Sequence, residues 1–229
     1  MNKKTQRSFS APMGMLTAFL LWTAAVRSID LQPIGPEGST VGFAAINQFV
    51  HNLTGVHMLL YTITDLLGLV PLLFVAGFGM LGLFQWIQRK HLSKVDYSIL
   101  VLGGYYIIVM AIYLFFEVFI INYRPILING CLEASYPSST TMLVMCVMPT
   151  AEMQLNSRLK SQRLKRCAAS AITVFTVFMV IGRLISGVHW FTDSVGGILL
   201  STGLVLMVGA VLRLKTSELQ PNVEVNRSI

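Results

Sequence analysis

The stretch G-R-L-I-S-G-V-H-W-F-T-D, Gly182 to Asp193, lies between two long apolar runs, Cys167–Ile185 and Val195–Leu214. Charged groups at the border of a membrane are costly, and those that persist there usually serve a site. The flanking runs predict two membrane helices joined by a short connection. Arg183, His189 and Asp193 predict that this connection carries a function.

The composition of the chain is that of an integral membrane protein. Its 229 residues are 54% hydrophobic and 12% charged, with a mean hydropathy of +0.68. A soluble domain of this size carries about 25% charged residues. The net charge of +7 raises the question of nucleic acid binding. The basic residues, however, cluster in short segments between apolar runs, a pattern typical of membrane topology and not of a nucleic-acid-binding face.

Six candidate membrane spans follow from the apolar runs, and each needs about 20 residues to cross a bilayer. The sequence therefore predicts an all-α, polytopic membrane helical bundle. Residues 1–229 form one domain, with the motifs between about 66 and 214. The first run is expected to be a retained helix and not a cleaved signal peptide. The spans are Ala11–Val26, Leu66–Ile87, Tyr97–Ile121, Thr141–Leu155, Cys167–Ile185 and Val195–Leu214.

The basic residues predict the orientation of these spans. With six spans, the basic groups at residues 3–7, 89–94, 158–166 and 213–215 all fall on one side, so both termini are expected in the cytoplasm. Residues 28–65, 122–137 and 186–192 then form the outer loops, and 43–51 can form a short interfacial helix. The compact loops and the lack of organelle signals favour a multi-pass protein of a bacterial plasma membrane.

Three polar stretches converge on the predicted outer face, and their chemistry suits phosphoryl transfer. Two arginines can clamp phosphate oxygens. A neutral histidine can attack phosphorus, with a carboxylate orienting its other nitrogen. A Pro-Ser-Ser-Thr helix start offers N–H groups and hydroxyls to an anion. No cofactor is implied, and no His/Cys/Asp cluster has metal-ligand spacing. The residues are Glu117, Arg124, Ser138, Ser139, Thr140, Arg183, His189 and Asp193.

These residues also have ordinary structural explanations. Arg183 can snorkel at a helix end, His189 can belong to an interfacial belt, and Asp193 can be the N-cap of the last span. The Pro-Ser-Ser-Thr stretch can be only a helix cap. Glu117 can pair with Arg124, or it can be a protonated carboxyl at the membrane edge. The conjunction of the three stretches favours a phosphate site over these separate explanations.

The chain resembles the type 2 phosphatidic acid phosphatase family, membrane lipid phosphatases that share a fold with vanadium haloperoxidases. The family has three motifs. They are a lysine followed after six residues by Arg-Pro, here E-V-F-I-I-N-Y-R-P from Glu117; Pro-Ser-Gly-His, here P-S-S-T from Pro137; and Ser-Arg, five residues, His, three residues, Asp, here the stretch from Gly182.

The resemblance implies a role for each matching residue. Arg124 and Arg183 would bind phosphate, with Ser138 and Ser139 lining the oxyanion cradle. His189 would be the nucleophile that forms a phosphohistidine, and Asp193 would orient it. The expected partners are a membrane lipid phosphate and the bilayer, with the active site facing outside.

Three positions depart from the family pattern: Glu117 replaces the lysine, Gly182 the serine, and Thr140 the histidine that protonates the leaving group. Such an acid contributes roughly 10²–10⁴-fold to the rate. A diphosphate expels a phosphate group, whose last pKa is about 6, and needs an acid less than a monoester does. The sequence therefore predicts a preference for lipid diphosphates such as polyprenyl diphosphates.

The alternatives are that a nearby residue supplies the acid (candidates His51, His57, Asp65 and Glu133), or that the protein only binds or transports lipid phosphates. Haloperoxidase chemistry is disfavoured.

Overall fold

The computed structural model describes the backbone of residues 3–225 and the side chains of residues 8–215. This part of the chain is helical, with three isolated β-bridges and no longer strand. Two short 3₁₀ helices, η1 (Pro36–Gly38) and η2 (Leu92–Lys94), lie in loops. The α-helices are α1 (Lys3–Val26), α2 (Ala44–Thr54), α3 (Met58–Leu67), α4 (Leu69–Arg89), α5 (Tyr97–Val118), α6 (Ser139–Arg158), α7 (Gln162–Ile185) and α8 (Phe191–Val225).

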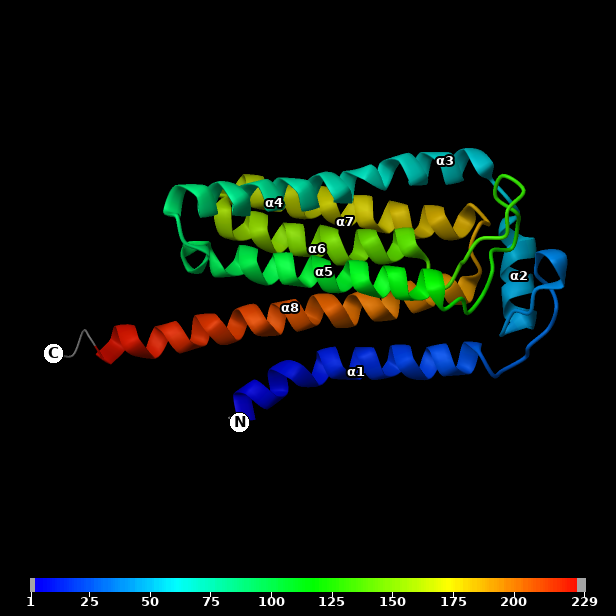
Figure 1. Cartoon of the computed structure of the whole chain (residues 1–229), viewed down its shortest axis with the longest axis horizontal. Helices are drawn as coiled ribbons and strands as arrows, with labels where there is room; N and C mark the ends of the chain where they lie inside the picture. The colour runs from blue at the N-terminus through cyan, green and yellow to red at the C-terminus, as the bar shows by residue number, and fades with distance from the viewer. Residues whose placement is uncertain (1–2, 226–229) are drawn as a thin grey trace.

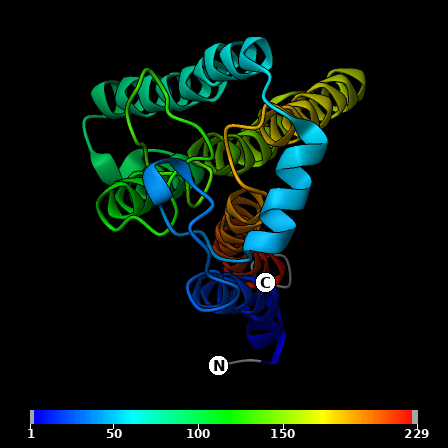
Figure 2. The same cartoon turned by 90° about the vertical axis from the view of Figure 1, so that its right-hand side faces the viewer.

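The long helices run along a common axis, and α2 lies across one end of them (Figure 1). The loop of residues 119–138 and the loop of residues 186–190 reach the same end, which we call the α2 end. The loop between α4 and α5 lies at the opposite end. Viewed along the bundle, α2 lies in front and runs from the end of α8 towards that of α7, while α4 and α5 lie to one side of it (Figure 2). The two loops that carry the predicted motifs are therefore neighbours in space.

Five helical segments are long and apolar enough to cross a membrane. They are Ser8–Val26, Met58–Arg89, Tyr97–Val118, Gln162–Ile185 and Phe191–Lys215. The fourth expected span, Thr141–Leu155, lies in α6, which is not among them. This helix packs against α4, α5, α7 and α8, and its polar groups are bonded inside the bundle. Thr150, for example, donates to the Cys146 carbonyl at 2.9 Å, and its hydroxyl lies 3.1 Å from that of Tyr106.

The second span begins earlier than the sequence predicted. Residues 28–65 were expected outside the membrane, yet α3 starts at Met58 and continues almost directly into α4, with a break at Gly68. The hydroxyls of Thr62 and Thr64 are satisfied within this helix, because they donate to backbone carbonyls one turn back, at 3.0 and 2.9 Å. Asp65 therefore belongs to a helix and not to a loop. The short helix expected at 43–51 is present as α2, Ala44–Thr54.

The first helix is built into the bundle through α8. Trp22 donates from its indole nitrogen to the Thr192 carbonyl at 3.2 Å. The hydroxyls of Thr23 and Tyr136 lie 2.7 Å apart. Phe19 stacks on the ring of Tyr136, with 6.4 Å between the centroids. Through Tyr136 and Thr192, α1 supports the loop of residues 119–138 and the start of α8.

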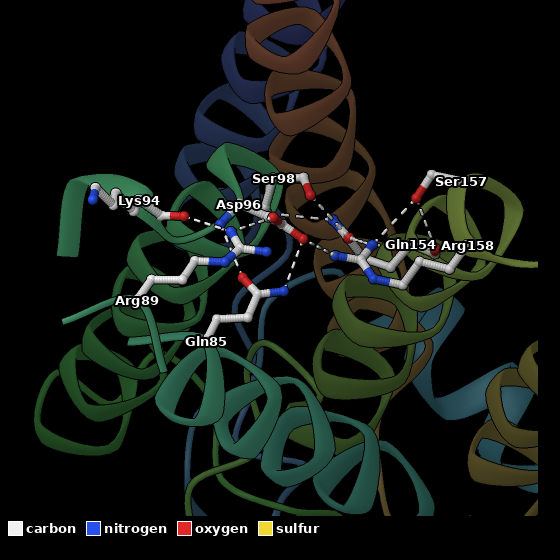
Figure 3. Close-up of polar contacts among 8 residues, drawn as sticks. All are labelled: Gln85, Arg89, Lys94, Asp96, Ser98, Gln154, Ser157 and Arg158. Atoms are coloured by element: carbon white, nitrogen blue, oxygen red, sulfur yellow. Dashed lines mark hydrogen bonds and ion pairs between the residues drawn. The ribbon is translucent and has the colours of Figure 1, made fainter. Parts of the chain in front are cut away.

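A polar cluster joins α4, α5 and α6 at the opposite end (Figure 3). Asp96 accepts hydrogen bonds from Arg89 Nη1 at 2.9 Å and Gln85 Nε2 at 2.8 Å, and Arg158 Nη2 lies 3.6 Å away. Arg158 also donates to Gln154. The bonds from Arg89 and Gln85 lower the pKa of Asp96 below its ordinary value. The cluster fastens the short α4–α5 connection without reaching the predicted site.

Candidate active site

The loop of residues 119–138 is held against the start of α8 and the residue before it by hydrogen bonds and close packing. The N–H of Ser138 donates to the carbonyl of Asp193 at 3.1 Å. The indole nitrogen of Trp190 donates to the carbonyl of Tyr123 at 2.8 Å. Gly196 faces the ring of Tyr136 so closely that a Cβ atom there would lie 2.7 Å from it. These contacts bring the first two motifs against the third.

His189 and Asp193 are both buried, and Ser135 stands between them. The hydroxyl oxygen of Ser135 lies 3.0 Å from Nδ1 of His189 and donates to Oδ2 of Asp193 at 2.5 Å. The sequence predicted that the carboxylate would orient the imidazole directly. In the structure, the carboxylate reaches it through this hydroxyl.

The Ser135 bridge determines the tautomer of His189. A serine hydroxyl has one proton, and Ser135 donates it to Asp193. The Ser135 oxygen can then only accept from His189, so Nδ1 carries the imidazole proton. Nε2 is left with its lone pair, and it has no hydrogen-bond partner among the described residues. An unprotonated ring nitrogen of this kind can act as a nucleophile.

Asp193 is held by two further donors. Asn122 Nδ2 donates to Oδ1 at 3.2 Å, and the Trp190 N–H donates to Oδ2 at 2.9 Å. Asp193 is the third residue of α8, so its bond to Trp190 is the backward half of a capping box. Asp193 therefore also helps to cap α8, which is the structural role considered for it from the sequence. Its carboxylate caps the helix and accepts from Ser135 with the same oxygen.

Arg124 lies in the loop of residues 119–138, next to Glu133. Its N–H donates to the Glu133 carbonyl at 3.0 Å, and its Nε lies 3.1 Å from Glu133 Oε2. This ion pair lacks hydrogen-bond geometry, and both Nε and Nη1 are buried without a hydrogen-bond partner. Glu117, the partner considered from the sequence, is exposed on α5, and no ion pair joins it to Arg124 in the described part of the chain.

Arg183 is almost completely buried against α3. Its Nη1 donates to Thr64 Oγ1 at 3.4 Å, its Nη2 lies 3.6 Å from Asp65 Oδ1, and its guanidinium carbon lies 4.7 Å from the centre of the Tyr61 ring. A Cβ atom at Gly182 would lie 3.0 Å from the Thr64 methyl group. Glycine at this position thus permits the close approach of α3. The Nε of Arg183 has no partner.

The second motif forms the start of α6. Ser138 precedes the helix, and its hydroxyl is buried without a partner, while its N–H is already bonded to Asp193. Ser139 and Thr140 are partly exposed and line a cavity of 330 Å³ between α4, α5 and α6. The rest of this lining is largely apolar. It includes Leu72, Val109 and Val147. A second, small cavity connects Ser139 with Ser135 and Glu117.

Burial and charge keep His189 neutral. Burial is the largest influence that lowers its pKa well below the ordinary value of 6.5, and the positive charges of Arg124 and Arg183 lower it further. A hydrogen bond with the backbone of Ser135 acts in the opposite direction. The imidazole is therefore unprotonated near pH 7, as attack on phosphorus requires.

Four of the residues predicted from the sequence have a buried polar atom without a partner. These are Arg124, Ser138, Arg183 and His189. Buried polar groups are normally hydrogen-bonded, and exceptions call for an explanation. Two guanidinium groups, a hydroxyl and an unprotonated nitrogen form a set that suits a phosphate group in contact with a nucleophile.

Two residues of this constellation carry no recognisable signal in the sequence. Ser135 and Asn122 have no distinctive spacing to the motifs, and serine and asparagine are common in loops. Their roles depend on the fold of the loop, in which the Ser135 N–H donates to the Asn122 carbonyl at 2.9 Å. This bond sets both side chains beside Asp193.

Comparison with known proteins agrees with this architecture. The family model described as PAP2 superfamily matches residues 73–216. A solved structure described as the first transmembrane PAP2-type phosphatidylglycerolphosphate phosphatase from Bacillus subtilis has a similar fold. The TM-score is 0.59 and the identity 20%, over 88% of this chain and 96% of the other. No curated protein sequence gives a significant match.

Proposed function

The chain belongs to the PAP2 superfamily, and on this basis we propose that it is a membrane phosphatase that removes phosphate from a lipid phosphate or diphosphate. One observation carries the proposal. The neutral imidazole of His189, which is linked through Ser135 to Asp193, has a free Nε2. The charges of Arg124 and Arg183, whose guanidinium groups have nitrogens without a hydrogen-bond partner, act on this imidazole.

The proposed reaction has two steps. In the first, Nε2 of His189 attacks phosphorus, the N–P bond forms, and the bond to the leaving oxygen breaks, with its electron pair remaining on that oxygen. In the second, water attacks phosphorus and the N–P bond breaks. Both water protons remain on the released phosphate, and the Nε2 lone pair is restored. Arg124 and Arg183 stabilise the charge on the equatorial oxygens, so no metal ion is required.

The 330 Å³ cavity supports a lipid substrate. Its lining from α4 and α5 is almost entirely apolar, and its polar end is formed by the hydroxyls of Ser139 and Thr140. It shares Tyr113, Ser139 and Met142 with the small cavity that reaches Ser135. A lipid chain in the larger cavity would place its headgroup near Ser139 and Thr140, at the start of α6 and next to the loop that holds Ser135.

The surroundings of Thr140 support a diphosphate substrate. None of the four candidate acids has a contact with Thr140 among the described residues. Glu133 and Asp65 lie beside the two arginines, His57 Nε2 is 2.8 Å from the Thr54 carbonyl, and the ring of His51 packs on Trp190. A leaving group that departs as a phosphate needs no such acid, because its last pKa is about 6.

The proposed enzyme has six spans, with α6 crossing inside the bundle, and both termini in the cytoplasm. The basic residues at the ends of α4 and α6, and those near the start of α7, support this orientation because they lie at the end opposite α2. The α2 end, with His189, then faces the outside of a plasma membrane.

Phosphate release by the purified protein in detergent micelles tests the proposal. We expect release from a polyprenyl diphosphate in the presence of a chelator, at least tenfold slower release from phosphatidic acid, and no release by His189→Ala. Equal turnover of both lipids would contradict the diphosphate preference alone. Tight binding of both lipids without any release would indicate a lipid-phosphate binding protein in place of an enzyme.

A further inference from the structure

We propose that Ser135 is a positioning residue for this reaction: its hydroxyl joins the imidazole of His189 to the carboxylate of Asp193 and holds Nε2 free for attack. The proposal rests on the proposed function, because it concerns the same site. It adds a residue that lies outside the three motifs.

The geometry leaves Ser135 as the link between the imidazole and the carboxylate. The serine oxygen is 3.0 Å from His189 Nδ1 and 2.5 Å from Asp193 Oδ2, and all three side chains are buried. The described contacts of the Asp193 carboxylate are with Ser135, Asn122 and Trp190, and none is with His189. Any orienting effect of the carboxylate on the imidazole therefore passes through one hydroxyl group.

Ser135 is itself fixed in position. Its N–H donates to the Asn122 carbonyl at 2.9 Å, and the preceding residue, Ala134, forms a β-bridge with Tyr123. The following residue, Tyr136, is buried, and its hydroxyl lies 2.7 Å from that of Thr23 on α1. A hydroxyl held on both sides in this way can preorganise the imidazole before substrate binds.

The role of Ser135 in the first step is to orient and to stabilise charge. When Nε2 bonds to phosphorus, the imidazole becomes positively charged while Nδ1 keeps its proton. The Nδ1 hydrogen bond to Ser135, which in turn donates to the Asp193 carboxylate, stabilises that charge. No proton has to move along this chain, because the leaving oxygen departs with the electron pair of the broken bond.

Substitution of Ser135 tests the proposal in the full-length protein. We expect Ser135→Ala to lower kcat roughly 10- to 100-fold, as for loss of a hydrogen bond to a charged group. The KM for polyprenyl diphosphate and the inhibition by inorganic phosphate should change little, because the arginines are untouched. Ser135→Thr, which keeps the hydroxyl, should restore most of kcat. Ser135→Cys keeps the packing but bonds weakly, so it should resemble Ser135→Ala.

The matched control is Ser201→Ala, which removes another buried serine hydroxyl. Ser201 donates to the Met142 carbonyl at 3.3 Å, two turns along α8 from Asp193. We expect this variant to keep the parental kcat. A fall in kcat equal to that of Ser135→Ala would assign the effect to general packing and overturn the proposal.

The pH profile gives a readout that a purely structural role would not move. Loss of the Ser135 hydroxyl removes a bond that favours the imidazolium, so the acidic limb of kcat/KM should move to lower pH. Arg124, Arg183 and Asp193, the charged groups around His189, are the same in both proteins. If the parent protein is active and Ser135→Ala has the same kcat, this inference alone is overturned. If the parent protein is inactive, the proposed function is overturned as well.

Discussion

Gly182 shows how one residue decides the surroundings of an arginine. Without a side chain at this position, α3 lies close enough for Thr64 and Asp65 to contact the guanidinium of Arg183. Arg183 would otherwise be a buried cation without a partner, which is strongly unfavourable. Glycine in place of the family serine therefore leaves room for α3 to pack beside Arg183. The Nε of Arg183 still has no hydrogen-bond partner.

The protonation of His189 gives a prediction at the same scale. Attack requires the neutral imidazole, so the rate should fall only when the pH falls through the folded-state pKa. Burial and the charges of Arg124 and Arg183 set this pKa below 6.5. We expect the acidic limb of kcat/KM, which reports the free enzyme, to lie below pH 6.5.

Arg183→Gln provides the comparison for this pH profile. It removes one positive charge near His189, so the limb should move to higher pH even though the rate also falls. Ionisation of the substrate is common to both proteins and cancels in the difference between them. A limb above pH 6.5 in the parent, or a shift to lower pH in the variant, would contradict the account.

At the scale of elements, the loop that carries His189 is supported by the connection between α2 and α3. The His57 N–H donates to the Ser186 carbonyl at 3.0 Å. Gly187 has a φ of +72°, and a Cβ atom there would lie 1.9 Å from the Gly55 carbonyl oxygen. On the other side, Asn47 of α2 donates to Thr192 Oγ1 at 3.0 Å and accepts from its N–H at 3.1 Å. The helix across the end of the bundle thus fixes the residues on both sides of His189.

Gly187→Ala should therefore separate these elements and displace His189. The left-handed φ alone costs about 1–2 kcal/mol for alanine, and the contact with the Gly55 carbonyl adds a backbone clash. We expect a marked fall in thermal stability and at least a tenfold loss of kcat, measured by thermal unfolding in detergent and by phosphate release.

Gly130→Ala is the control, because Gly130 has a similar φ of +77° but no atom within 4 Å of the added Cβ. It should lose about 1–2 kcal/mol of stability and keep its kcat. Equal losses of stability and kcat in the two variants would mean that the packing of the α2–α3 connection against Gly187 contributes to neither.

The elements also indicate what could be predicted from the sequence. The helical fold and most helix positions follow from the apolar runs, because a span requires length and hydrophobicity. The start of this helix at Met58 cannot be predicted from the sequence, because Thr62, Thr64 and Asp65 are polar residues typical of a loop. Only the folded structure shows that the two threonines bond to carbonyls of the same helix and that Asp65 pairs with Arg183. The motif residues could be found from their spacing, whereas Ser135 and Asn122 could not, because only the folded loop sets them beside Asp193.

At the scale of the whole molecule, the two ends of the bundle differ in character. The α2 end holds buried arginines, a histidine and an aspartate, while the opposite end holds exposed basic residues and the Asp96 cluster of Figure 3. The exposed basic residues, and not the buried charges, direct the orientation of the protein in a membrane, because they are free to interact with lipid headgroups and the insertion machinery.

Two native cysteines can test the resulting orientation. Cys131 is exposed in the loop at the α2 end, and Cys167 is exposed in the second turn of α7 at the opposite end. In intact cells, a membrane-impermeant maleimide should label the variant that retains only Cys131 and should spare the variant that retains only Cys167. After permeabilisation, both should react. Labelling of Cys167 alone in intact cells would reverse the proposed topology.

The most direct test of the central claim is to trap the intermediate on His189. The protein is mixed with polyprenyl diphosphate labelled with ³²P at the terminal phosphate and is quenched in alkali within one turnover, because phosphohistidine is lost in acid. We predict labelled protein whose label survives alkali, is lost in acid, and is absent from His189→Ala. A parent protein that releases phosphate without ever carrying the label, or a labelled His189→Ala variant, would contradict the account.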